Sequence, residues 1–162
     1  MMKQCRNFGL ILFLIIVFIY GCNKNIEPVL IITHSEKILS FSKCFVIQGN
    51  DTLTDNLIPL DSTAEMQFIG TTGFKLVDGK AFVGASMSVA DSTGAILYRN
   101  DDLFLDYDTI GFDPELVKER IGIFLETSYP MVKGGIYKWN AKIWDKKGNG
   151  EINAELLIKI KL

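Results

Sequence analysis

The chain has 162 residues with 17 basic and 19 acidic side chains, so its formal net charge is −2. This length suits one domain with an adequate hydrophobic core. The slightly acidic balance gives no electrostatic reason to bind nucleic acid, and no run of five like charges indicates a charged tail.

The N-terminal segment has the composition of a secretory signal peptide. Lys3 and Arg6 supply positive charge, and an uncharged apolar stretch runs from Phe8 to Tyr20, interrupted only by Gly9. This stretch is shorter than the roughly 20 apolar residues that a membrane-spanning helix needs. A cleaved leader is therefore favoured over the alternative, an uncleaved helical anchor.

The apolar stretch ends in Ile19-Tyr20-Gly21-Cys22, with a small residue directly before a cysteine. This arrangement resembles the lipobox of bacterial lipoproteins, although Ile19 replaces the usual leucine and Tyr20 is bulkier than is common. The resemblance implies that residues 1–21 are a signal peptide and that Cys22 is lipidated. It also implies a protein anchored through lipid in the bacterial cell envelope, at the periplasmic or surface face of the outer membrane. Two or more acyl chains would hold it there stably.

Cleavage would change the composition of the mature chain. Lys3, Arg6 and Cys5 leave with the leader, so the mature charge would be 15 basic against 19 acidic side chains, a net of −4. Cys44 then has no disulfide partner. No histidine or cluster of cations adjoins it to lower its pKa, so we interpret Cys44 as a small buried hydrophobe rather than a nucleophile.

Residues 22–37 are predicted to be a tether, within which Val29–Thr33 could pair as an edge strand. From Ile38 to the C-terminus, at residue 162, apolar residues recur with a period of two, the pattern of half-buried strands. Glycine-containing turns separate the expected strands. The segments predicted as strands are 44–48, 52–58, 64–68, 85–90, 95–98, 121–126, 137–143 and 152–162.

The last two predicted strands show the period of two most clearly. The odd residues from Tyr137 to Ile143 are apolar, and so are the even residues from Ile152 to Leu162. Trp139 is on the apolar side and is predicted to lie in the core, whereas Trp144 is on the polar side. Such strands bury one face and expose the other.

One helical signal interrupts the strands. Asp113-Pro114-Glu115 combines an N-cap residue, proline at the first helical position and an acid in the first turn. We therefore predict an all-β fold: an antiparallel, immunoglobulin-like sandwich of about 7–9 strands over residues 38–162, with one short helix in a crossover loop.

The segment from Asp145 to Ile152 partly matches a calcium-binding EF-hand loop. Lys147 stands at a ligand position, however, and Leu156 stands where the bidentate carboxylate belongs. We interpret the segment as a hairpin turn.

Four carboxylates fall close together in the sequence, at Asp101, Asp102, Asp106 and Asp108. They could converge on a hard cation such as Ca²⁺, which would be the one cofactor implied, or provide the paired acids of a glycoside hydrolase. Solvated surface acids are the alternative that we favour.

Aromatic residues share the same long connection. Phe104, Tyr107 and Phe112, together with Trp144 on its strand, are candidate ligand-binding residues, because exposed aromatic rings stack on sugars and anchor protein partners. The alternative, which we favour, is that the aromatic side chains of the connection fill the open end of the sandwich and that Trp144 packs under a loop.

The leader and the final hairpin together resemble small cell-envelope lipoproteins with one immunoglobulin-like domain. The leading hypothesis is a membrane-anchored, non-enzymatic binding or assembly module whose partner is an envelope protein or a glycan. The alternatives are a glycan-directed, carboxylate-dependent hydrolase and a structural subunit of a surface assembly. No phosphate-binding glycine loop, G-x-S-x-G or CxxC motif adds support for an enzyme.

Overall fold

The computed structural model of the protein describes residues 32–162. The predicted signal peptide (residues 1–21), the predicted lipidation site Cys22 and the predicted tether as far as residue 31 lie outside the described residues.

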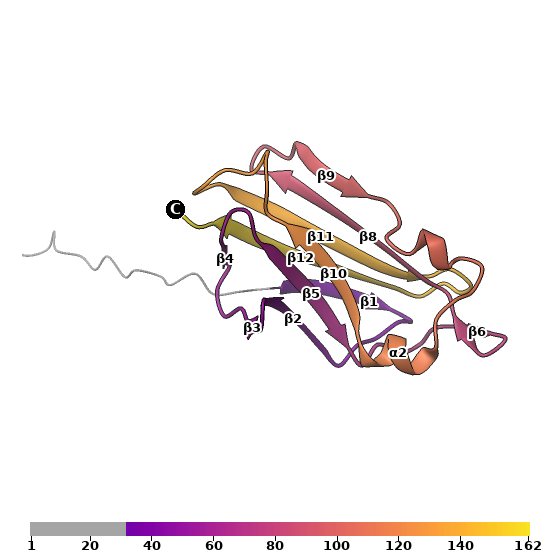
Figure 1. Ribbon diagram of the computed structural model, residues 1–162. Coiled ribbons are helices and arrows are strands. Elements are labelled where there is room, and N and C mark those ends of the chain that lie inside the picture. Colours follow the sequence, from indigo (N-terminus) through magenta and orange to yellow (C-terminus); the bar gives the residue numbers. More distant parts are fainter. Residues whose placement is uncertain (1–31) are drawn as a thin grey trace, which may run out of the picture.

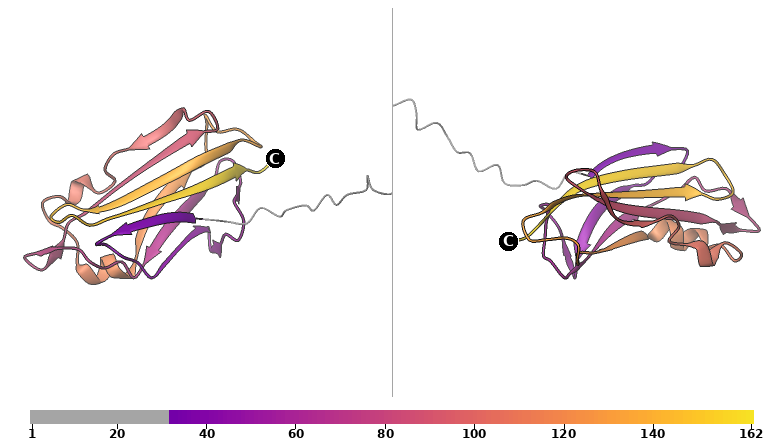
Figure 2. Two further views of the ribbon diagram at one scale, coloured as in Figure 1. Left: turned by 180° about the vertical axis from the view of Figure 1, so that it is seen from behind. Right: turned by 90° about the horizontal axis from the view of Figure 1, so that it is seen from above.

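Two β-sheets stack face to face (Figures 1 and 2). The larger sheet has the order β1 (Ile32–Lys37), β12 (Glu151–Ile160), β11 (Ile136–Asp145), β8 (Val83–Asp91) and β9 (Ile96–Asn100), and β4 (Leu57–Ile58) adds to β12. The smaller sheet has the order β10 (Ile121–Glu126), β5 (Thr63–Ile69), β2 (Lys43–Gln48) and β3 (Asp51–Thr52). A small hairpin joins β6 (Leu76–Val77) to β7 (Lys80–Ala81).

The all-β sandwich predicted from the sequence is confirmed. Eight strands have five or more residues, within the expected 7–9, and the pairing is antiparallel except where β4 meets β12. The short helix α2 (Pro114–Glu119) and the 3₁₀ turn η2 (Leu105–Tyr107) lie in the connection that crosses from β9 in one sheet to β10 in the other. The Asp113 side chain caps α2 by accepting the Glu115 backbone N–H at 2.9 Å, as the sequence signal indicated.

The core forms where the apolar faces of the two sheets meet. In β11 and β12 the buried residues alternate strictly with half-buried or exposed ones, in the predicted phase. Trp139 is fully buried and is the largest side chain of the core. Burial of these alternate apolar side chains is the main free-energy term that holds the sheets together.

Three local details differ from the sequence prediction. Residues 32–37, assigned to the tether, form β1 and pair with β12 along their whole length, so the folded domain begins before Ile38. The predicted strand 52–58 is divided between β3 and β4, which belong to different sheets. Glu65 and Gln67 alternate with apolar residues along β5, the pattern of a half-buried strand, yet both are only 6% exposed.

Candidate functional site

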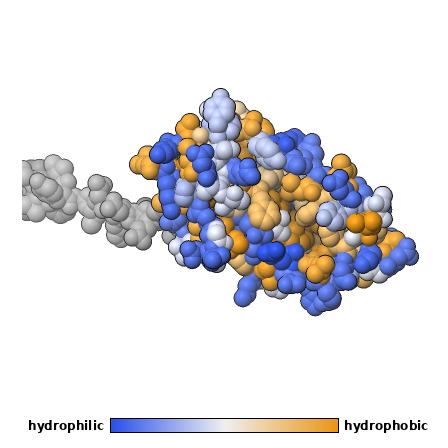
Figure 3. Space-filling view, in the orientation of Figure 1, coloured by the Kyte–Doolittle hydropathy of each residue, from blue (hydrophilic) through white to orange (hydrophobic). Residues whose placement is uncertain are grey.

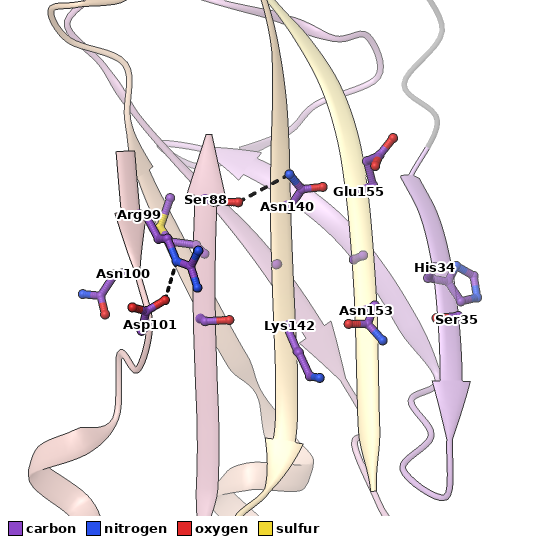
Figure 4. A pocket seen from close by; sticks show the side chains of 14 residues that line it. His34, Ser35, Ser88, Arg99, Asn100, Asp101, Asn140, Lys142, Asn153 and Glu155 are labelled. Atoms are coloured by element: carbon purple, nitrogen blue, oxygen red, sulfur yellow. Dashed lines mark hydrogen bonds and ion pairs between the residues drawn. The ribbon is translucent and has the colours of Figure 1, made fainter. Parts of the chain in front are cut away.

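The outer face of the larger sheet carries a shallow polar depression of about 630 Å³. Residues from five of the six strands of the sheet line it, and Figure 4 shows them crossing the sheet from β9 to β1. We call this surface the polar face. Its polar lining residues are His34, Ser35, Ser86, Ser88, Arg99, Asn100, Asp101, Asn140, Lys142, Asn153 and Glu155.

Strand register arranges these side chains in two rows. One row runs through the paired positions Arg99, Ser88, Asn140 and Glu155, and the other through Ser86, Lys142, Asn153 and Ser35. Positions two residues apart along a strand point to the same side, so the rows lie side by side on one surface. The sheet thus presents an ordered grid of polar groups.

The charged groups of the polar face are balanced by ion pairs. Lys138 Nζ lies 3.1 Å from a carboxylate oxygen of Glu155, and Lys142 Nζ lies 2.9 Å from one of Glu151. The hydrogen bond from Lys142, followed by its charge, lowers the pKa of Glu151.

Arg99 is paired with Asp101 at the β9 edge of the same face. Because the charges pair with one another, the surface between them is nearly neutral.

Uncharged hydroxyl and amide groups occupy that neutral surface. Asn140 donates a long hydrogen bond of 3.4 Å to Ser88. Ser86 and Asn153 form no side-chain hydrogen bond to another residue in the described part of the chain. These groups can therefore donate to, and accept from, a ligand that lies across the strands.

Trp144 lies on the same side of β11 as Asn140 and Lys142, which confirms its predicted polar-facing phase. Its indole ring covers Gly84 of the neighbouring strand: a Cβ atom added there would lie 2.0 Å from Trp144 Cε2. Trp144 is half-buried, so it extends the polar face by a partly exposed aromatic surface next to Lys142.

The four candidate metal ligands do not gather around one point. Asp102 and Asp108 both pair with Lys146 Nζ, which lies 2.6 Å from Asp102 Oδ2. Asp101 is paired with Arg99, and Asp106 is exposed. The cation at the centre of the acidic loop is therefore a lysine ammonium group.

Lys146 is largely buried between these carboxylates. Burial by itself would lower its pKa, but the hydrogen bonds and charges of Asp102 and Asp108 outweigh this effect and raise it. Its ammonium group also donates to the Phe104 carbonyl oxygen at 3.4 Å. Lys146 thus fastens the loop between β9 and α2 to the end of β11.

Within residues 32–162, no group of three or more His, Cys, Asp or Glu side chains is arranged to hold a metal ion. In the segment compared with an EF-hand loop, buried Asp145 accepts the backbone N–H groups of Lys75 and Lys147, at 2.7 and 2.9 Å. These bonds give Asp145 the role of a turn residue.

The aromatic residues of the long connection form a compact cluster. Phe112 contacts Phe104 edge-on, with ring centroids 5.3 Å apart, and stacks on Tyr107 at 4.5 Å. Phe104 and Phe112 pack against the core, whereas Tyr107 is 43% exposed. Phe104 and Phe112 therefore fit the alternative in which aromatic side chains fill the open end of the sandwich. Tyr107 keeps a partly exposed ring.

A second surface, which the sequence did not indicate, lies between the strands at the edges of the two sheets. A groove of about 560 Å³ separates β9 from β10, and its walls include Tyr98, Leu103, Phe124 and Tyr129. Figure 3 shows apolar residues gathered over the middle of this side of the molecule and toward α2. We call it the seam groove. It lies where edge strands of the two sheets approach each other, and no sequence pattern within a single strand indicates such an arrangement.

Cys44 packs against the core as predicted, although it is only partly buried. Burial raises the pKa of its thiol to about 12. The thiol is therefore protonated at neutral pH and lacks the reactivity of a catalytic cysteine.

The described part of the chain contains no helix long and apolar enough to cross a membrane. No protein-family model matches the sequence, and no curated protein matches it.

Proposed function

We propose that this protein is a non-enzymatic binding module of the bacterial cell envelope, anchored through a lipid on Cys22, which binds a glycan on its polar face. One observation carries the proposal: uncharged hydroxyl and amide groups from several strands lie in a shallow depression whose charges are already paired.

Glycan chemistry matches this surface in three respects. Sugar hydroxyls both donate and accept, as do the serine and asparagine side chains of the two rows. A neutral glycan needs no net charge from its site, and the ion pairs leave none. Half-buried Trp144 offers an apolar ring surface beside Lys142, suited to the C–H face of a sugar.

The arrangement of acids favours binding over glycoside hydrolysis. A hydrolase needs two carboxyl groups facing a substrate across a cleft, about 5–10 Å apart. Here Asp102 and Asp108 face Lys146, and Asp101 faces Arg99. A carboxylate held by a neighbouring cation is poorly placed to deliver a proton to a glycosidic oxygen.

A lipid tether suits such a module, because confinement at a membrane raises the effective concentration of the domain near envelope glycans. Weak individual contacts are then enough for a glycan to occupy the shallow polar face.

Glycan binding is tested by removing two amides of the polar face. Asn140→Ala with Asn153→Ala is compared with the wild type and with a matched control, Asn50→Ala, at the exposed turn after β2. The probes are purified peptidoglycan fragments and outer-membrane oligosaccharides, measured by calorimetry. We expect at least about a tenfold loss of affinity for the double variant, or about 1.4 kcal/mol, and none for the control.

Two results would contradict the glycan proposal. One is that no oligosaccharide binds the wild type. The other is that the double variant binds as well as the wild type while thermal melting shows both to be folded.

The anchor is tested separately with Cys22→Ala. We expect the wild type to sediment with membranes and to label metabolically with a fatty-acid analogue, and the variant to do neither. A variant that still sediments and keeps residues 1–21 would favour the uncleaved helical anchor instead.

A structural subunit of a surface assembly is the second candidate. The seam groove favours it, because β9 and β10 each pair with only one strand in the described residues and leave an unpaired edge. Subunit assembly predicts concentration-dependent oligomers, which sedimentation velocity would detect.

A further inference from the structure

The smaller sheet carries a separate pocket of about 190 Å³ between β10, β5 and α2. Its walls are mostly apolar and include the rings of Phe104, Phe112 and Phe124. Glu65 also lines the pocket, although its side chain is only 8% exposed. A buried carboxylate in an apolar pocket needs partners for both of its oxygens.

Only one oxygen of Glu65 has such a partner. Gln67 Nε2 donates to Oε2 at 2.9 Å, whereas Oε1 is buried without a hydrogen bond among the described residues. Gly122 provides the space for Oε1, since an added Cβ atom would lie 1.9 Å from it. The strand thus accommodates an acceptor that no group among residues 32–162 uses.

What Oε1 lacks is a hydrogen-bond donor rather than a counter-charge. Arg120 Nη1 lies 3.9 Å away, close enough for charge compensation but too far for a hydrogen bond. A second cation would be repelled by Arg120, so a neutral donor such as a hydroxyl group fits the site best.

The volume of the pocket and the residues that line it restrict the class of ligand further. About 190 Å³ is below the usual range for whole small-molecule ligands and suits one side chain. Phenylalanine rings favour edge-on or offset contact with another ring. Leu116 and Phe124 line the pocket and are more than half exposed, so this side of the pocket is accessible from solvent.

We propose that this pocket binds the phenol side chain of a tyrosine presented by a partner protein, with the hydroxyl donating to Glu65 Oε1. The edge of β10, which pairs with no second strand among residues 32–162, would receive the extended segment that carries this tyrosine, together with the adjoining seam groove, which shares Phe104, Gly122 and Phe124 with the pocket. This site lies on the smaller sheet and is independent of glycan binding by the polar face.

The pocket is tested by NMR titration of the folded domain with three probes. p-Cresol mimics the tyrosine side chain, toluene lacks only its hydroxyl group, and n-butylammonium mimics lysine. We expect p-cresol to shift the Gly122 amide resonance and to bind at least fivefold more tightly than toluene. Equal affinity for p-cresol and toluene, or tighter binding of n-butylammonium, would overturn the proposal.

A paired substitution checks that Glu65 is the acceptor. Glu65→Met with Gln67→Met removes both partners of the buried hydrogen bond, which costs much less than removing one. We expect toluene to bind this variant as it binds the wild type, and the advantage of p-cresol to disappear. If p-cresol still binds the variant more tightly than toluene does, the acceptor is a group other than Glu65. If the variant does not fold, the relative affinities of the wild type for p-cresol and toluene still test the proposal.

Peptide probes separate a protein partner from a free phenolic compound. A pentapeptide with tyrosine at its centre and threonine and valine around it is compared with the same peptide carrying phenylalanine. We expect the tyrosine peptide to bind more tightly than both the phenylalanine peptide and p-cresol, because the β10 edge adds contacts. A tyrosine peptide no tighter than p-cresol would refute the strand-presented partner.

Discussion

Replacing Lys146 by methionine removes the cation on which Asp102 and Asp108 converge. The Lys146 and Asp102 side chains are 12% and 18% exposed, with 2.6 Å between the paired atoms, whereas Asp108 is 42% exposed. For unit charges 4 Å apart, Coulomb attraction is about 4 kcal/mol at an effective dielectric constant of about 20, and loss of hydration offsets much of it. We expect a net coupling of about 1–2 kcal/mol for Asp102 and below about 1 kcal/mol for Asp108.

Double-mutant cycles measure these couplings directly. Urea unfolding is followed for the wild type, Lys146→Met, Asp102→Asn and their combination, and the same cycle is repeated with Asp108→Asn. Hydrogen exchange should also become faster at the Phe104 amide, which donates to Asp102 Oδ1. A coupling near zero with Asp102, or a larger one with Asp108, would refute the geometry on which the prediction depends.

The pH dependence has a definite sign. The folded-state pKa of Lys146 is raised above its ordinary value of 10.5, so its stabilising contribution is complete below that pH. It is lost as the pH rises through the raised folded-state pKa, where the ammonium group deprotonates. The stability difference between the wild type and Lys146→Met should therefore shrink in alkaline solution above pH 10.5.

Three further predictions concern single side chains. Trp139→Ala should lower the free energy of unfolding by about 3–5 kcal/mol in urea titrations, because the ring is fully buried. A loss below about 1 kcal/mol would mean that the ring is not a core side chain. Cys44 should resist iodoacetamide at pH 8 in the folded protein and react after unfolding, as peptide mass spectrometry would show, because burial raises its pKa to about 12. Rapid labelling of the native protein would contradict this. Gly84→Ala should displace the Trp144 ring, with a red shift of tryptophan fluorescence and a loss of about 1–3 kcal/mol, since the new Cβ would overlap the ring. An unchanged spectrum and stability would show that the ring does not lie on Gly84.

The polar face shows which features a pattern within one strand predicts and which it does not. The phase of β11 correctly placed Trp139 in the core and Trp144 on the opposite side. The serine and asparagine positions that accompany Trp144 were visible as uncharged residues between apolar ones. Their alignment into rows depends on the register between β8, β11 and β12, which no single strand encodes.

The acidic loop and the Glu65 pocket illustrate where sequence reasoning stops. Four carboxylates close in sequence suggested a cation, and the cation proved to be Lys146, 38 residues beyond Asp108 in the chain. Glu65 alternates with apolar residues along β5, yet its carboxylate folds over Gly122 of the neighbouring strand and is buried there.

The sequence by itself determined most of the longer strands, the crossover helix and which faces of β11 and β12 enter the core. These follow from periodic burial and helix capping, which act over a few residues. Tertiary structure alone decided that β1 joins β12, that Lys146 pairs with Asp102 and Asp108, and that Glu65 Oε1 finds no donor within the described part of the chain. The physical reason is that hydrogen bonds and ion pairs need contact at a few ångströms, and only the packing of distant segments determines which groups come that close.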